Sequence, residues 1–242
     1  MGTRTYSTVL IGSGNVASHL GQALEQTGHL VVRFGGRTRT APIPQDADLY
    51  IIAVTDSAIA SVATEIGDVP GLVVHTAGSM PMSILPQRRK GVLYPLQTFT
   101  KGMPVDLHSV PFFIESEGGE DLLRDVASQI GGDVLEMDSE RRRYLHLAAV
   151  FCNNFTNHMY RITEELLSQH NIPFEVMLPI IDETARKVHS LSPAQAQTGP
   201  AVRWNIGVME SQLNLLERDD LKQLYQIISK SIHHDKLQSQ QD

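Results

Sequence analysis

The sequence predicts an α/β domain with a mostly parallel sheet, followed by an all-α domain. A short apolar run near the N-terminus ends in Gly-x-Gly-x-x-Ala, which is typical of a strand, a tight turn and a helix. Further apolar runs then alternate with helical patterns, and no strand-like run appears after Ser139. We therefore divide the chain into an α/β domain over residues 1–138 and a helical domain over residues 139–242.

Composition limits the classes of partner. The chain has 242 residues, 41% of them hydrophobic, which is enough for two modest domains with a buried core. A net charge of −7 argues against nucleic acid, whose binding needs a basic face, and against anionic membrane surfaces. No apolar run is long enough to span a membrane, and the first residues lack the centre of a signal peptide. The single cysteine, Cys152, excludes an internal disulfide, and we expect a cytoplasmic protein.

The first strand and helix carry the strongest motif. Gly12 allows the turn, Gly14 lets the backbone approach a pyrophosphate, and Ala17 is small enough for the helix over residues 15–27 to pack on the strand. The start of that helix offers free N–H groups to phosphates. The pattern predicts a Rossmann-like dinucleotide site, with a glycine-rich turn that binds no ligand as the alternative. Its predicted contacts are Gly12, Ser13, Gly14, Asn15, Val16 and Ala17.

The stretch after the second strand, residues 30–34, indicates the type of nucleotide. An NAD site usually has Asp or Glu about 20 residues after the glycines, to bind the ribose 2′-OH. Here the sequence has no acid there and instead has Arg37, Thr38 and Arg39. Because guanidinium groups bind phosphate through charge-assisted forks, this favours the 2′-phosphate of NADP. The alternative is that both arginines are ordinary solvated loop charges.

The segment that follows is too short for a usual crossover helix, because Ala41-Pro42-Ile43-Pro44 cannot form a helix interior. Apolar runs then predict strands over residues 49–54, 72–75, 91–94, 110–114 and 134–137, with helices over 58–66 and 121–130. Ligands of open α/β sheets lie outside the carboxyl ends of the strands. The predicted contacts there are Val54, Thr55, Asp56, Thr76, Ala77 and Gly78 for the cofactor, and Ser79, Gln97 and Thr98 for a substrate or the nicotinamide amide.

The C-terminal half predicts helices over residues 140–169, 174–191, 200–216 and 219–233, with Ser139 as the N-cap of the first. That first helix is apolar around most of its circumference, so we expect it to be buried. His146, Asn153 and Asn157 recur on one face at α-helical spacing, and Cys152 falls off that face as a core thiol. The three polar residues either line the cleft beside the nicotinamide or bond neighbouring helices. No histidine lies at metal-ligand spacing from a cysteine or carboxylate, so we expect no metal.

The sequence as a whole resembles the superfamily of 6-phosphogluconate dehydrogenase, β-hydroxyacid dehydrogenases and pyrroline-5-carboxylate reductase. The segments His75-Thr76-Ala77-Gly78-Ser79, Tyr94-Pro95-Leu96-Gln97-Thr98-Phe99, Ala149–Phe155 and Gln197–Ala201 are more closely similar to NADP oxidoreductases that join a Rossmann-like domain to a C-terminal helical domain of unknown function. The resemblance covers nearly the whole chain. It implies an N-terminal NADP-binding domain and a homodimer formed through the helical domain, which would also contribute to the substrate site.

The chain departs from the β-hydroxyacid dehydrogenases at one position. Those enzymes carry a catalytic lysine three residues before an Asn-Asn pair, whereas here the pair Asn153-Asn154 is preceded by Val150. Because valine transfers no proton, His146 is the best substitute acid, and imine reduction needs less acid catalysis than alcohol oxidation.

The sequence therefore predicts an NADP-dependent oxidoreductase of a small carbonyl or imine. His146 would donate the proton, Asn153 and Asn157 would orient the substrate, and Asn154 and Arg203 would bind it, Arg203 through a carboxylate. For Arg203, a surface salt bridge is an equal alternative. Two other functions remain open: a sensor or scaffold that holds NADP(H) without turnover, and a dimeric structural protein that has lost the cofactor.

Overall fold

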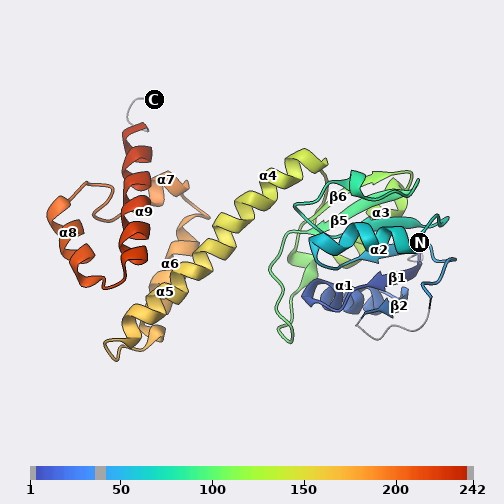
Figure 1. Ribbon diagram of the computed structural model, residues 1–242, viewed down its shortest axis with the longest axis horizontal. Helices are drawn as coiled ribbons and strands as arrows, with labels where there is room; N and C mark the ends of the chain where they lie inside the picture. The colour runs from blue at the N-terminus through green and yellow to red at the C-terminus, as the bar shows by residue number, and fades with distance from the viewer. Residues whose placement is uncertain (1–3, 36–41, 239–242) are drawn as a thin grey trace. The chain divides into compact units, whose positions relative to one another are not determined.

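A computed structural model describes residues 4–35 and 42–238. The chain forms two compact units that meet in sequence between Met159 and Tyr160 (Figure 1). The boundary at residue 138 marks the change from strands to helices and stays a prediction as a domain boundary. The first unit contains the sheet and the start of a long helical segment, and the regular elements among the described residues of the second are all helices.

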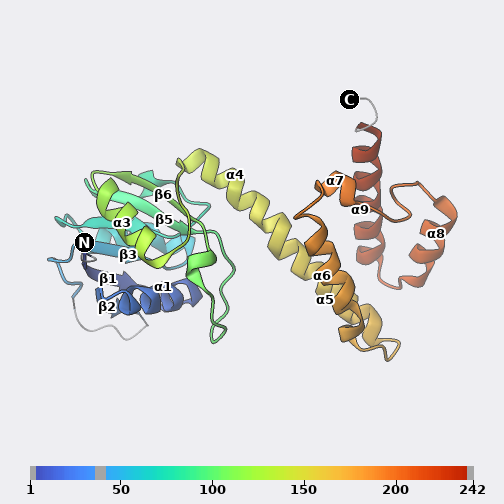
Figure 2. The same ribbon diagram turned by 180° about the vertical axis from the view of Figure 1, so that it is seen from behind.

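The sheet has seven strands in the order β2-β1-β3-β4-β5-β6-β7 (Figures 1 and 2). All neighbours pair in parallel except β5 and β6, which are antiparallel. This confirms the predicted α/β fold with a mostly parallel sheet followed by helices. The strands are β1 (Ser7–Ile11), β2 (Leu30–Phe34), β3 (Leu49–Ile52), β4 (Leu72–His75), β5 (Lys90–Pro95), β6 (Phe112–Glu117) and β7 (Val134–Glu136).

Helices cover both faces of this sheet. Helices α1 (Asn15–Gln26) and α3 (Glu120–Ile130) pack on the face that carries Leu10, Ile51 and Val74. Helix α2 (Ile59–Ile66) packs on the other face. Because the central strands are buried on both sides, they appear in the sequence as continuous apolar runs rather than alternating ones. Three short 3₁₀ helices lie at Asp56–Ala58, Met82–Ile84 and Leu107–Ser109.

The described part of the β2–β3 connection, residues 42–48, contains no helix, as its prolines predict. Ile43 and Ala47 from this connection are buried in the same apolar cluster as α2. Two loop side chains therefore cover sheet surface that a crossover helix would otherwise cover.

The helical half begins with α4 (Ser139–Ala149), which continues through a π-helical turn (Val150–Phe155) into α5 (Thr156–Ser168). The π-helical turn interrupts the long helix that the sequence predicts over residues 140–169. Ser139 is not the N-cap. Asp138 is, because its carboxylate accepts a hydrogen bond from Arg141 N at 2.8 Å, which leaves the Ser139 hydroxyl to other partners. The later elements are a 3₁₀ helix (Phe174–Met177), α6 (Leu178–Lys187), α7 (Pro193–Ala196), α8 (Ile206–Leu215) and α9 (Asp219–Gln238).

Helix α8 begins six residues later than the predicted start at Pro200. Residues 200–204 form a turn in which Trp204 has a φ of 49°, a left-handed conformation that interrupts helix geometry. The side chain of Asn205 then caps the helix by accepting a hydrogen bond from Val208 N at 3.3 Å.

The expectation that the long helix is buried is wrong for the single chain. Leu147 and Phe151 are 52% and 62% exposed, and Tyr144 and Phe155 are also exposed. The helix carries apolar side chains around its circumference, as expected, but within one chain too few neighbouring residues pack against them to cover them.

At the end of β4, His75 has no solvent exposure. Its Nδ1 accepts a hydrogen bond from Ala77 N at 3.2 Å, so its proton belongs on Nε2, which faces Pro81 O. Burial, reinforced by the nearby Arg142 charge, lowers the pKa of His75 to about 4. The carboxylates of Glu115 and Asp56 favour the charged form of the imidazole but do not offset the effect of burial on its pKa.

We predict that His75 makes the fold sensitive to acid. Above pH 6.5 His75 is neutral in both the folded and the unfolded state. Between pH 6.5 and about 4 the imidazole binds a proton in the unfolded chain but not in the folded one. The free energy of unfolding therefore falls as the pH falls through this range. The loss approaches roughly 3 kcal/mol. Urea unfolding across this range should show a steeper decline for the wild type than for His75→Gln. The exposed His170→Gln should decline like the wild type, and parallel curves for all three would contradict the prediction.

Candidate functional site

A cavity of about 1410 Å³ lies at the carboxyl ends of β1, β3, β4 and β5, beside α4 and the π-helical turn, all within the first unit. It brings together most of the site residues that the sequence predicts. Those that line it are Gly12, Ser13, Gly14, Asn15, Val16, Val54, Thr55, Thr76, Gln97, Thr98, His146, Asn153 and Asn154.

The remaining predicted residues do not line the cavity or are outside the described residues. Ala17, Asp56, Ala77, Gly78, Ser79, Asn157 and Arg203 are absent from its lining, and Arg37, Thr38 and Arg39 lie outside the described ranges. Ala17 packs against Gly12, in keeping with its expected role in holding helix to strand. The Ser79 hydroxyl donates to the carboxylate of Asp56 and so links the loops that follow β4 and β3.

The glycine turn has the geometry that a dinucleotide phosphate requires. Gly12 has a φ of +143°, and a Cβ there would lie 2.1 Å from Ala53 O, so only glycine fits. A Cβ on Gly14 would meet no atom within 4 Å, because this residue faces open space at the start of α1. No side chain caps that helix start. Its first N–H groups and the positive end of its dipole therefore suit a pyrophosphate.

The end of β2 closes the neighbouring part of the cavity with Phe34 and Gly35. A Cβ on Gly35 would lie 2.8 Å from Gly12 O, so the close approach of the two backbones keeps this position free of a side chain. An acidic residue that binds a ribose 2′-OH therefore has no room at position 35.

The loop after β5 is attached to α1 by side chains of that helix. Asn15 Nδ2 donates to Phe99 O at 2.7 Å, and His19 Nε2 lies 2.9 Å from Met103 O, with its ring 5.0 Å from that of Phe99. Asn15, predicted as a cofactor contact, thus also holds a loop that lines the cavity through Gln97, Thr98 and Phe99.

Two residues of the cavity wall were missed or misplaced by sequence reasoning. Tyr94 lines the cavity, and its position at the carboxyl end of β5 was a signal that could have identified it. Cys152 is exposed and lines the cavity, so the expected core thiol is wrong. A π-helical turn has more residues per turn than an α-helix, so faces counted at α-helical spacing do not continue through Val150–Phe155.

His146 and Tyr94 meet inside the cavity. The Tyr94 hydroxyl lies 3.0 Å from His146 Nδ1, and the two rings lie edge to face with centroids 5.9 Å apart. Burial raises the pKa of Tyr94, so the phenol keeps its proton at neutral pH.

A model of the family described as a domain of unknown function, DUF2520, matches residues 110–232, just over half of the chain. The chain belongs to the DUF2520 family. The matched region starts before β6, so it includes the last two strands of the sheet as well as most of the helical half. No curated protein matches the chain.

Solved structures extend the similarity over nearly the whole chain. The provisionally assigned NADP oxidoreductase BF3122 of Bacteroides fragilis is 43% identical, with a TM-score of 0.87 over 95% of this chain and 98% of that one. Pyrroline-5-carboxylate reductase of Streptococcus pyogenes shares the fold at 15% identity, with a TM-score of 0.63 over 96% and 98%. An imine reductase of Myxococcus stipitatus, solved with NADP⁺, does so at 12% identity, with a TM-score of 0.62 over 97% and 94%.

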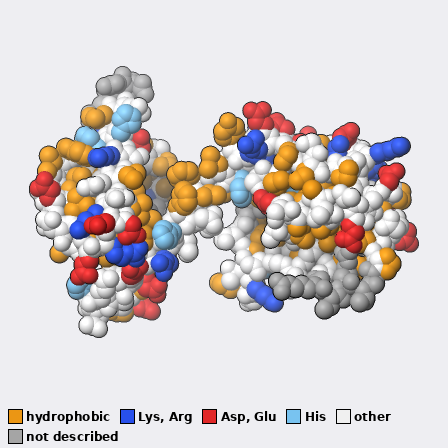
Figure 3. Space-filling view, in the orientation of Figure 1, with side chains coloured by type: hydrophobic (Ala, Val, Ile, Leu, Met, Phe, Trp, Pro, Cys, Tyr) orange, Lys and Arg blue, Asp and Glu red, His pale blue; other side chains and the backbone are white. Residues whose placement is uncertain are grey.

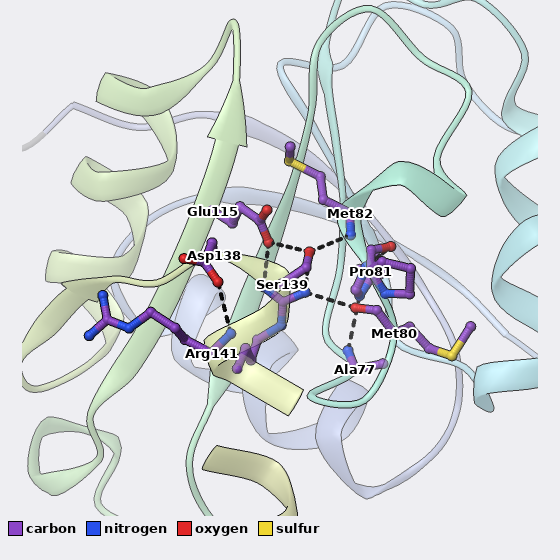
Figure 4. A network of polar contacts seen from close by, with 10 residues as sticks. Ala77, Met80, Pro81, Met82, Glu115, Asp138, Ser139 and Arg141 are labelled. Atoms are coloured by element: carbon purple, nitrogen blue, oxygen red, sulfur yellow. Dashed lines mark hydrogen bonds and ion pairs between the residues drawn. The ribbon is translucent and has the colours of Figure 1, made fainter. Parts of the chain in front are cut away.

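Within the DUF2520 region, Arg142 fixes α4 to the sheet. This arginine has no solvent exposure, and its Nη1 lies 2.5 Å from a carboxylate oxygen of Glu115 on β6. Its Nη2 donates to Met80 O at 2.7 Å. The Ser139 hydroxyl donates to Glu115 at 2.7 Å and accepts from Met82 N at 2.9 Å, so it joins the sheet to the loop after β4 (Figure 4). His146 follows Arg142 by one helical turn and is thereby held over Tyr94.

We predict that Arg142→Met unfolds more easily by about 3–5 kcal/mol, because it leaves the Glu115 carboxylate and the Met80 carbonyl without their buried partner. Equilibrium urea denaturation measures the change. Arg124→Met is the matched control: it removes an exposed pair with Glu136 and should cost about 0–1 kcal/mol. Equal losses in the two variants would show that the buried network does not hold α4 as described.

Proposed function

We propose that the chain is an NADP(H)-dependent oxidoreductase that transfers a hydride between the nicotinamide and a small carbonyl or imine substrate. One observation carries this proposal: a single cavity joins the open glycine turn at the start of α1 to the His146–Tyr94 pair on α4 and β5. A phosphate site and a proton-donating site in one cavity are what a nicotinamide enzyme needs from its protein.

Four observations support NADP as the cofactor. The structure leaves no room for a side chain at Gly35, and the sequence has no acid between Phe34 and Gln45 but has Arg37, Thr38 and Arg39 to bind a 2′-phosphate. BF3122, at 43% identity, is a provisional NADP oxidoreductase, and the similar imine reductase was solved with NADP⁺.

The residues around the cavity divide the remaining tasks. When bound, NADPH supplies the hydride. His146 supplies the proton that accompanies it to the carbonyl oxygen or imine nitrogen. Asn153 orients the substrate from the cavity wall, and Asn157, which is exposed on the same helix, is assigned that role with it. Gln97, Thr98 and Asn154 contact substrate from the lining, whereas Ser79 and the exposed Arg203 stay predictions from sequence.

The lack of charge in the cavity favours an imine over an alcohol as the reacting group. None of the described residues that line it is Lys, Arg, Asp or Glu. Val150 occupies the position of the lysine that the resemblance leads one to expect. A protonated imine already attracts hydride and needs little acid catalysis, whereas alcohol oxidation needs a general base to remove the hydroxyl proton.

We predict that NADPH binds more tightly than NADH and that Arg37→Ala removes most of the difference, roughly 10- to 100-fold, because a charge-assisted fork to the 2′-phosphate is lost. Gly14→Ala should keep the fold, since its Cβ faces open space, yet weaken both nucleotides by obstructing the phosphates. Nucleotide fluorescence titration measures the affinities.

Gly207→Ala, in α8, is the control for adding a methyl group and should bind like the wild type. If Gly14→Ala binds NADPH unchanged, the phosphate site is placed wrongly. Tight binding with no NADPH consumption across a panel of carbonyls and imines would favour the sensor or scaffold function. No binding of either nucleotide would favour a structural protein.

We propose further that the chain is a homodimer formed through its helical half. From Tyr160 onward, the buried hydrophobic side chains among the described residues are Ala201, Met209 and Leu221. Hydrophobic side chains are instead spread over the surface of this unit (Figure 3). Such surface on a protein in water marks an interface. Its larger exposed members are Ile172, Val176, Leu178, Ile180, Val188, Leu191, Ile206, Val208, Leu215, Ile227 and Leu237.

We predict a dimer for the wild type in sedimentation equilibrium and a weakened dimer for Ile180→Glu, which places a charge on the exposed apolar surface of α6. Leu30→Glu is the matched control: Leu30 is 72% exposed on the edge strand β2 and should leave assembly unchanged. A wild-type monomer, or equal effects of both substitutions, would contradict the proposed interface.

No described helix is both long and apolar enough to cross a bilayer. The cytoplasmic location stays a prediction.

A further inference from the structure

The hydrogen bond between Tyr94 and His146 has a donor and an acceptor, and the proposed function does not depend on which residue is which. The ring of Tyr94 is only 8% exposed and packs with Val92 and Phe113 in a small apolar cluster at the β5–β6 ladder. Because the Tyr94 ring is enclosed by these side chains, it is held in one orientation. Its hydroxyl then reaches Nδ1 of His146 at 3.0 Å, and not Nε2.

The neighbouring backbone is shaped around this contact. A Cβ on Gly78 would lie 2.7 Å from His146 Nδ1 and 2.7 Å from the carbon of Tyr94 that bears the hydroxyl. Any side chain at position 78 would therefore enter the space where the two rings meet. Gly78 was predicted as a cofactor contact, but in the structure it lies outside the cavity lining and behind the pair. The third constraint is the buried Arg142, which holds the helix turn before His146.

Hydrogen-bond chemistry then fixes the proton on His146. Burial raises the pKa of Tyr94, so its hydroxyl remains a donor at neutral pH. A protonated phenol can donate or accept, but among the described residues Nδ1 is the acceptor that this hydroxyl reaches, so donation to Nδ1 is the arrangement that gives the hydroxyl proton a protein partner. A neutral imidazole that accepts at Nδ1 carries its proton on Nε2. No hydrogen bond from the described residues engages Nε2, and His146 lines the cavity.

We propose that Tyr94 is a positioning residue: by donating to Nδ1 it locks neutral His146 in the Nε2–H tautomer and presents that N–H to the cavity as a hydrogen-bond donor that orients substrate and keeps its proton. The consequence for turnover rests on the proposed function, whereas the tautomer itself does not. Without the hydroxyl, neutral histidine would exchange between its two tautomers and turn about its side-chain bonds, so a smaller share of the protein would present a donor.

The direct test is ¹⁵N NMR of the full chain with labelled histidine, without nucleotide and at a pH where His146 is neutral. The His146 signals are assigned by their loss in His146→Gln. In the wild type we expect Nδ1 to have the shift of a bare, accepting nitrogen and Nε2 that of a protonated one. Tyr94→Phe, which keeps the ring and its packing, should move the two shifts toward each other as the tautomers mix.

Tyr6→Phe is the matched control. It removes a tyrosine hydroxyl that donates to Asp125 at 2.7 Å in the same unit, outside the large cavity, and should leave the His146 signals unchanged. Gly78→Ala is a second route to the same result, because it separates the rings without altering either. The proposal is overturned if Tyr94→Phe and Gly78→Ala both leave the wild-type shifts in place, or if the proton is found on Nδ1 in the wild type.

Turnover tests the proposed function separately. With NADPH and the cyclic imine 2-methyl-1-pyrroline as the probe, Tyr94→Phe should lower kcat roughly tenfold and leave KM for NADPH unchanged, because fewer molecules present the N–H that holds the substrate in place. A tautomer shift in Tyr94→Phe together with no turnover in the wild type would uphold the positioning role and count against the reductase.

Discussion

A guanidinium with no access to solvent must have its charge balanced by the protein, and in this chain Glu115 does so from β6. The same arginine binds Met80 O and shares Ser139 with the carboxylate, so one side chain connects the sheet, the loop after β4 and the first turn of α4. The angle at which α4 leaves the sheet follows from these bonds. So does the meeting of His146, one turn later, with Tyr94. The chemistry proposed for the cavity thus depends on a polar contact outside its lining.

The sequence was informative where one physical cause acts locally. Continuous apolar runs identified the central strands because both faces of the sheet are covered. The glycines at 12 and 14 had distinct expected tasks, and the structure gives them distinct surroundings: one is enclosed by Ala53 O and the other is open. The prolines near residue 43 likewise predicted a connection without a helix, and the described residues have none.

The sequence was less informative where a feature depends on distant contacts. Arg141, Arg142 and Arg143 are adjacent, and nothing in that run shows that only the middle one is buried. The π-helical turn has no local signature, yet it moves Cys152 into the cavity wall against the expectation from α-helical spacing. The burial expected for the long helix came from its apolar composition, which does not reveal whether its partner is the same chain or a second copy.

The contact between Gly35 and Gly12 also limits how this cavity can evolve. In Rossmann-like folds an acidic residue near the end of the second strand binds the ribose of NAD, and an arginine nearby accommodates the 2′-phosphate of NADP. Here position 35 is closed to an acidic residue, because the first atom of any side chain would meet the carbonyl of Gly12. Gly12 is itself held against Ala53 O and cannot yield. Selection for a different nucleotide would have to act further along the connection to β3. The glycine turn proposed to bind the pyrophosphate would then also limit changes in the preference for the ribose end.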